Sequence, residues 1–161
     1  MRNLKRAASE FLALDPIAVV GVSRDPSSPA NLIYRKLKET GHRVFAVNPK
    51  AREVEGDRCY ANLATLPAPV EGVVIVTPPE AAAAVVDDCA AVGVRSVWMH
   101  RSFGHGSVSR EAVDRCRRHG ISVIPGGCPM MHCAPVDRGH ACMRAVLRLT
   151  GKLPVPLSAA Q

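Results

Sequence analysis

Five short segments carry the residues whose types could hold a phosphorylated ligand. Each follows an apolar run: Gly21-Val22-Ser23-Arg24, Asn48-Pro49-Lys50, Thr77-Pro78-Pro79, His100-Arg101 and Gly126-Gly127-Cys128. In the first, glycine lets the backbone approach a phosphate, and the helix that follows supplies free N–H groups and a positive dipole end. Ser23 adds a hydroxyl and Arg24 a cation. The alternative is that Gly21 makes a tight turn and Ser23 is a local cap, and this segment alone leaves both open.

The second segment separates the candidate nucleotides. Proteins that bind NAD usually carry G-x-G-x-x-G after the first strand and an acidic residue after the second. Here Ser23 and Pro26 stand where further glycines belong, and Lys50 stands near the place of the acid. A lysine there suits an extra phosphate on the ribose, as in NADP or coenzyme A; the alternative is a solvated loop lysine. The missing glycines argue against a dinucleotide and favour coenzyme A.

The third segment is chemically inert. Pro78 and Pro79 have fixed φ angles and present a flat apolar wall, which suits one face of an adenine ring. A proline pair that simply starts a helix is an equally good interpretation.

Short β-branched runs alternate with helical patterns along the chain, which indicates βαβ units. The predicted strands are residues 17–22, 43–47, 72–76, 95–99 and 121–124. The predicted helices are residues 29–40, 79–92, 108–119 and 141–149, with a helical turn near Leu63 in an otherwise loop-like stretch. We therefore predict an α/β, Rossmann-like three-layer fold with a mainly parallel five-stranded sheet. Ligands of such sheets bind outside the carboxyl ends of the strands, where the five segments lie.

Length and composition predict one domain. Of the 161 residues, 47% are hydrophobic, enough for one core. We expect that domain over residues 15–150, a helix or arm over 1–14 and a flexible tail over 151–161. No apolar run approaches the ~20 residues of a membrane span, and no signal peptide is evident, which predicts a cytoplasmic protein that does not bind membranes. The net charge of +7 is dispersed, and no nucleic-acid module is recognisable, so we expect no nucleic-acid partner.

Cysteine and histidine residues gather toward the C-terminus. They are Cys128, His132, Cys133, His140 and Cys142. Their spacing matches no zinc signature, and we interpret them as reduced, mostly structural residues rather than as a metal or thiol centre. No nucleophile motif or acid–base pair stands out, so we assign no catalytic residue and no metal ligand.

An ordered set of motifs resembles a known family. The set comprises residues 18–24 (AVVGVSR), 43–50 (RVFAVNPK), Glu55-Gly56 with Tyr60, 74–79 (VIVTPP) and 97–99 (VWM). Over residues 15–129 it resembles the CoA-binding domain family, which is related to the N-terminal domain of the succinyl-CoA synthetase alpha subunit.

The resemblance implies roles for the segments. Gly21, Val22, Ser23 and Arg24 would border the phosphates of coenzyme A; Asn48, Pro49 and Lys50 would hold the phosphorylated ribose; and Thr77, Pro78 and Pro79 would flank the adenine. The family commonly shows Trp-x-Gln after the fourth strand, where this chain has His100, so we include His100 as a binding residue without a defined role. Cys128-Pro129 resembles a recurrent Cys-Pro of the family.

Two functions remain open at this point. The first is a non-catalytic protein that binds coenzyme A or an acyl-CoA, since the synthetases need a second, ligase-type domain that we do not find in this chain. The second is an NADP-dependent oxidoreductase, or a protein that depends on thiol or metal chemistry. Whether the protein is a homo-oligomer or has a protein partner is left open.

Overall fold

The computed structural model describes residues 3–159, and its centre is a seven-stranded sheet of order β3-β4-β2-β1-β5-β6-β7. The strands are β1 (Ile17–Val20), β2 (Val44–Val47), β3 (Glu53–Val54), β4 (Asp57–Tyr60), β5 (Gly72–Ile75), β6 (Ser96–Met99) and β7 (Ser122–Pro125). All neighbours pair in parallel except β3 and β4. The α/β class and the mainly parallel sheet are therefore confirmed.

The prediction of five strands is wrong, because the stretch expected to be mostly loop adds two. Strands β3 and β4 form a hairpin whose turn residues, Glu55 and Gly56, have φ angles of 52° and 76°. Positive φ at both central residues is what a tight two-residue hairpin turn requires. Two residues of β4 then pair in parallel with β2. The hairpin escaped sequence reasoning because its strands are too short to show an alternating apolar pattern.

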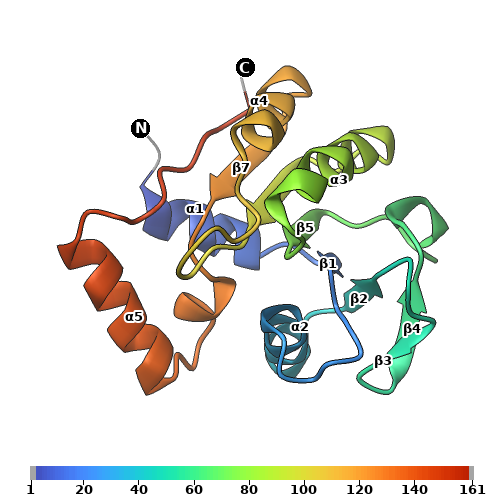
Figure 1. Cartoon of the computed structure of the whole chain (residues 1–161), viewed down its shortest axis with the longest axis horizontal. Helices are drawn as coiled ribbons and strands as arrows, with labels where there is room; N and C mark the ends of the chain where they lie inside the picture. Colours follow the sequence, from blue (N-terminus) through green and yellow to red (C-terminus); the bar gives the residue numbers. More distant parts are fainter. Residues whose placement is uncertain (1–2, 160–161) are drawn as a thin grey trace.

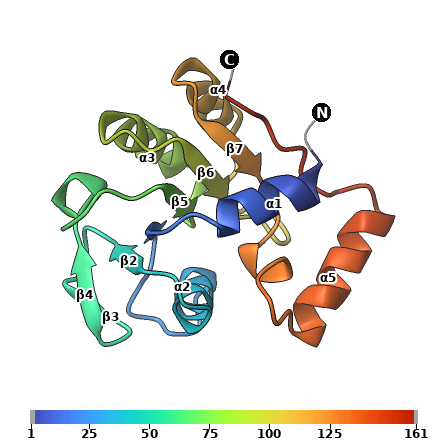
Figure 2. The ribbon, with the colours of Figure 1, turned by 180° about the vertical axis from the view of Figure 1, so that it is seen from behind.

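Helices cover both faces of the sheet and make the three layers (Figures 1 and 2). They are α1 (Leu4–Leu12), α2 (Pro29–Glu39), α3 (Pro79–Ala91), α4 (Arg110–Arg118) and α5 (Arg138–Leu149), with 3₁₀ turns η1 (Leu63–Thr65) and η2 (Pro129–Met131). Helices α1 and α2 bury Phe11 and Ile33 in one core with Trp98 of β6. Helices α3 and α4 bury Val86 and Cys116 in the other.

Helix α5 differs from the others because only Leu147 of its twelve residues is buried. It stands apart from the sheet, and η2 lies between it and α2 (Figure 1). The helix begins three residues before the predicted start, because the Asp137 side chain caps it by accepting from the His140 N–H.

Beyond α5, Leu157 exchanges two backbone hydrogen bonds with Val123 of β7. The flexibility predicted for residues 151–161 stays a prediction, since residues 160 and 161 lie outside the described part.

Within residues 3–159, no helix has the length and apolar character needed to cross a membrane.

Candidate functional site

The carboxyl ends of β1 and β5 meet at the point where the strand order reverses. The chain leaves β1 for β2 on one side and later returns to β5 on the other. Gly21, with φ +111°, follows β1, and a Cβ placed on it would lie 2.3 Å from the Val76 carbonyl oxygen. Only glycine allows this approach, so the close packing of two strand ends explains Gly21 without a ligand. The same approach brings segment 21–24 beside segment 77–79.

A buried amide fixes the loop after β1. The Ser23 N–H donates to Asn31 Oδ1 at 2.9 Å, and Asn31 Nδ2 donates back to the Ser23 carbonyl at 2.8 Å. Asn31 lies in the first turn of α2 and is only 1% exposed. Sequence reasoning missed this residue, because an asparagine near a helix start usually indicates no more than a cap.

The same amide ties the loop to the β3–β4 hairpin. Asn31 Nδ2 also donates to Glu55 Oε1 at 2.6 Å, and Arg35 Nη1 donates to the same oxygen at 2.7 Å. The hydrogen bond from Asn31, with a smaller effect of the one from Arg35, holds the pKa of Glu55 below its usual value. A pocket of about 230 Å³ lies between loop and hairpin, lined by Ser23, Arg24, Pro26, Asn31 and residues 53–56.

The loop satisfies most of its own backbone donors. Asp25 Oδ1 accepts from both the N–H and the hydroxyl of Ser27, which lowers the pKa of Asp25. The Asp25 N–H in turn donates to Ser23 Oγ at 3.1 Å. Arg24 is exposed and has no ion pair with any described residue. The conformation is thus set before any ligand arrives, and the Arg24 guanidinium remains available.

Asn48 holds the second segment against the first. Its Nδ2 donates to the Val22 carbonyl at 2.9 Å, and its Oδ1 accepts from the Lys50 N–H at 2.9 Å. Val22 itself is fully buried, and Pro49 and Lys50 are exposed. The Lys50 ammonium has no acidic partner among residues 3–159.

The third segment contains an unsatisfied hydroxyl. Thr77 Oγ1 is buried and has no hydrogen-bond partner within the described chain. Pro78 and Pro79 begin α3, which confirms the helix-start interpretation of the proline pair. Pro78 is nevertheless exposed beside Thr77, so it can also contact a ligand.

His100 lies one strand further along the carboxyl ends of the strands and is mostly buried. It is 8% exposed, its N–H donates to the Ile75 carbonyl, and its Nε2 lies 3.1 Å from Ser102 Oγ. Burial lowers the pKa of His100 to about 4, so the ring is neutral at neutral pH. The structure therefore groups segments 21–24, 48–50 and 77–79, while His100 is a neutral, mostly covered neighbour.

Cys128 is buried and chemically quiet. It is 2% exposed, and burial raises its pKa to about 11. Across residues 3–159, no three His, Cys, Asp or Glu side chains are grouped so that they could hold a metal ion.

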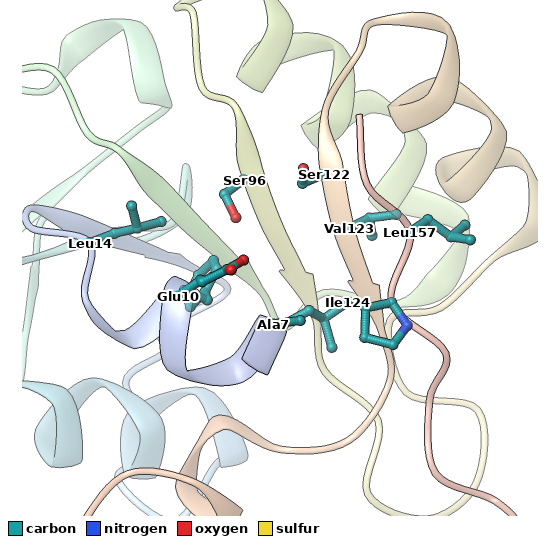
Figure 3. A pocket seen from close by; sticks show the side chains of 10 residues that line it. Ala7, Glu10, Leu14, Ser96, Ser122, Val123, Ile124 and Leu157 are labelled. Atoms are coloured by element: carbon teal, nitrogen blue, oxygen red, sulfur yellow. The ribbon is translucent and has the colours of Figure 1, made fainter. Parts of the chain in front are cut away.

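A further pocket lies at the other end of the strands, beside the amino ends of β6 and β7. It has a volume of about 190 Å³ and is lined by Ser96 and Ser122, the first residues of β6 and β7, together with Phe11 and Leu14 (Figure 3). Ligands of open parallel sheets bind at the carboxyl ends of the strands, so this pocket at the amino ends does not belong to the candidate site.

Comparison with known proteins gives a consistent result. The model of the CoA binding domain family matches residues 15–134. Among curated proteins, the ADP-forming acetate–CoA ligase I of Archaeoglobus fulgidus is 28% identical over 118 residues, which cover 70% of this chain but 17% of the ligase. The chain thus spans less than a fifth of that relative's length.

Two solved structures resemble the fold. A hypothetical protein from Pyrococcus horikoshii OT3 superposes with a TM-score of 0.76 at 27% identity, covering 84% of this chain and 96% of that protein. The dinucleotide forming acetyl-coenzyme A synthetase 1 of Ca. Korarchaeum cryptofilum, in its apo form, superposes with a TM-score of 0.59 at 33% identity. That match covers 68% of this chain and 25% of the synthetase.

Proposed function

Because this chain belongs to the CoA-binding domain family, we propose that it binds coenzyme A at the carboxyl ends of β1, β2 and β5, without catalysing a reaction itself. The observation that carries the proposal is the convergence of three segments. Asn48 joins the loop after β2 to Val22, and Gly21 lets the loop after β1 approach the end of β5.

The charges around this convergence suit a phosphorylated ligand. Arg24 and Lys50 are exposed cations without ionic partners in the described chain, and each can approach a phosphate. We assign the diphosphate to segment 21–24 and the 3′-phosphate to Lys50. Asn48 and Pro49 support Lys50 from the loop, and the uncharged Asn48 side chain acts through its hydrogen bonds to the Val22 carbonyl and the Lys50 N–H.

The adenine end has a matching surface. Thr77 Oγ1 can donate to or accept from a base nitrogen after a small side-chain rotation, which would satisfy a hydroxyl that now has no partner. Pro78 and Pro79 supply the apolar wall for the ring. His100 is neutral and mostly buried, so it would support this wall from the side of β6 rather than meet a phosphate charge.

The test compares coenzyme A with dephospho-coenzyme A by titration calorimetry. A charge-assisted contact contributes about 1.5–3 kcal/mol, so the loss of the 3′-phosphate should weaken binding roughly ten- to a hundredfold. Lys50→Ala should remove most of that difference, whereas Lys5→Ala, an equal charge change at an exposed position of α1, should not. No measurable affinity for coenzyme A would refute the proposal, and equal affinities for the two ligands would refute the role of Lys50.

NADP is the second candidate, because Lys50 would equally suit a 2′-phosphate. The same calorimetry with NADP decides between them: we expect it to bind far more weakly than coenzyme A and not to displace it. The proposal that the chain catalyses no reaction is tested by incubation with ATP, coenzyme A and a panel of small carboxylic acids, which should give no thioester above background.

A further inference from the structure

A second pocket opens on the same edge of the sheet, next to β6 and β7. It has a volume of about 540 Å³, within the range of small-molecule sites. Arg101 and Gly127, which follow β6 and β7 and are joined by a backbone hydrogen bond of 3.0 Å, line it on the side of the sheet. The last turn of α5 and residues 150–153 form its far wall.

The lining combines apolar side chains with two cations. Val146, Leu147, Leu153 and Phe103 supply the apolar part, and Phe103 is 65% exposed. An exposed aromatic ring that lines a pocket offers apolar surface that a ligand can cover. This composition suits a short aliphatic chain.

The cations are Arg101 and Lys152, and no acidic residue lines the pocket. Neither cation has an ion-pair partner anywhere in the described chain. The Arg101 guanidinium lies over Gly126, where a Cβ would be 3.5 Å from its Nη2. Two unpaired cations without a nearby acid favour an anionic group at the end of the aliphatic chain.

The pocket lies within reach of the proposed coenzyme A site. Segment 21–24 follows β1, and from β1 to β7 there are three strand spacings, roughly 14 Å in total. The pantetheine arm has about as many chain atoms as four extended residues, so it reaches roughly 14 Å. An arm that starts at segment 21–24 can therefore bring its thiol end to Gly127.

We propose that this pocket receives the acyl group of an acyl-CoA, and that it selects an acyl chain ending in a carboxylate. The inference rests on the proposed binding of coenzyme A and adds the class of ligand. The methylene groups of the acyl chain contact Leu147 and Leu153, and the terminal carboxylate pairs with Arg101 and Lys152.

The test compares glutaryl-CoA with pentanoyl-CoA, which have the same number of acyl carbons and differ in the terminal carboxylate. By calorimetry, glutaryl-CoA should bind about tenfold more tightly than pentanoyl-CoA. Lys152→Gln and Arg101→Gln should each remove most of this difference. Arg148→Gln, an equal charge change on α5 outside this pocket, should leave it unchanged.

The outcomes separate this inference from the proposed function. If coenzyme A binds and the two thioesters bind equally, the acyl pocket is refuted and the proposed function stands. A preference for glutaryl-CoA that survives both substitutions would refute the assignment to this pocket. If coenzyme A itself does not bind, both proposals fall together. Lys152 is exposed, so its variant should keep the thermal unfolding midpoint of the wild type and report on binding alone.

Discussion

Around the ends of β1, β2 and β5, the side-chain amides of Asn31 and Asn48 join one loop to the next, whereas around β6 and β7 two cations without ion-pair partners in the described chain border an open pocket. We call the first region, residues 21–24, 31–35, 48–50, 53–56 and 77–79, the nucleotide half, and the second, residues 100–104, 126–128 and 146–153, the acyl half. In the nucleotide half, Asn31 and Asn48 hold the backbone in place, and Glu55 forms an ion pair with Arg35. Each half has two cations without an ion-pair partner in the described chain, Arg24 and Lys50 in the first and Arg101 and Lys152 in the second, but those of the acyl half line the larger pocket.

The difference indicates a division of tasks. A loop fixed by its own hydrogen bonds costs little further ordering when a ligand binds, so the nucleotide half suits a constant part of the ligand. The acyl half borders a pocket of about 540 Å³, against about 230 Å³ beside the loop after β1, and its two unpaired cations can pair with a charge that only some ligands carry, so it suits the variable part. If one half is held by its own hydrogen bonds and the other is an open pocket, substitutions in the two halves should differ in their effects on stability and binding.

The largest effect is expected at Gly21. In Gly21→Ala, the Cβ would lie 2.3 Å from the Val76 carbonyl oxygen, at a φ angle of +111°. The clash and the strained φ angle together should lower the free energy of unfolding by about 3–4 kcal/mol, measured by urea denaturation. Gly41→Ala is the matched control, because its φ is +92° but nothing lies within 4 Å of its Cβ. It should cost only about 1–2 kcal/mol. Equal losses would show that the strand ends do not approach each other as described.

His100, in the acyl half, should contribute a pH-dependent part of the stability. Burial lowers the pKa of this imidazole from 6.5 to about 4. The unfolded chain therefore takes up a proton as pH falls through 6.5, while the folded chain stays neutral until about pH 4. Stability should fall by about 2–3 kcal/mol across this window, and His100→Gln should remove that loss.

The exposed His105→Gln, in the same loop, is the control for His100, because its imidazole lies in solvent in both states. Denaturation curves at several pH values between 7.5 and 4 measure both variants. If His100→Gln keeps the full pH dependence, the imidazole is not buried as the structure has it.

A smaller loss is expected in the nucleotide half from Asn31→Ala. The substitution leaves the Ser23 N–H and the Glu55 carboxylate without their shared partner and should cost about 2 kcal/mol. It should also weaken coenzyme A binding, since the loop is no longer held. Asn62→Ala removes an exposed cap of η1 and should cost only about 1 kcal/mol with unchanged binding. A loss no larger than that of Asn62→Ala would contradict the role of Asn31 as the tie between loop and hairpin.

The smallest expected response comes from Cys128. Its burial and a pKa raised to about 11 should protect it from oxidised coenzyme A, whereas exposed Cys142 should react first. Intact-mass measurement after treatment of native protein, followed by peptide mapping, checks this. A single adduct on Cys128 that disappears in Cys128→Ser would show that the thiol opens to the ligand.

Much of the architecture could be predicted because the signals were local. The five apolar runs became β1, β2, β5, β6 and β7, each within two residues of the predicted ends. Helix α2 begins at Pro29 after the Ser28 cap, as the Ser-Ser-Pro pattern indicates, and Gly41 follows its end with a positive φ angle. The β3–β4 hairpin was missed because β3 has two residues, and its place in the sheet depends on β2, a separate segment.

By itself, the sequence determined the α/β class, the positions of the strand-end loops and the resemblance to the CoA-binding domain family, because apolar periodicity and turn residues are properties of neighbouring positions. Only the tertiary structure decided that Gly21 meets Val76, that Asn31 joins Ser23 to Glu55, which lies 24 residues after Asn31, and that Arg101 and α5 line one pocket. These contacts join residues far apart in the chain, and their geometry follows from how the sheet and its helices pack.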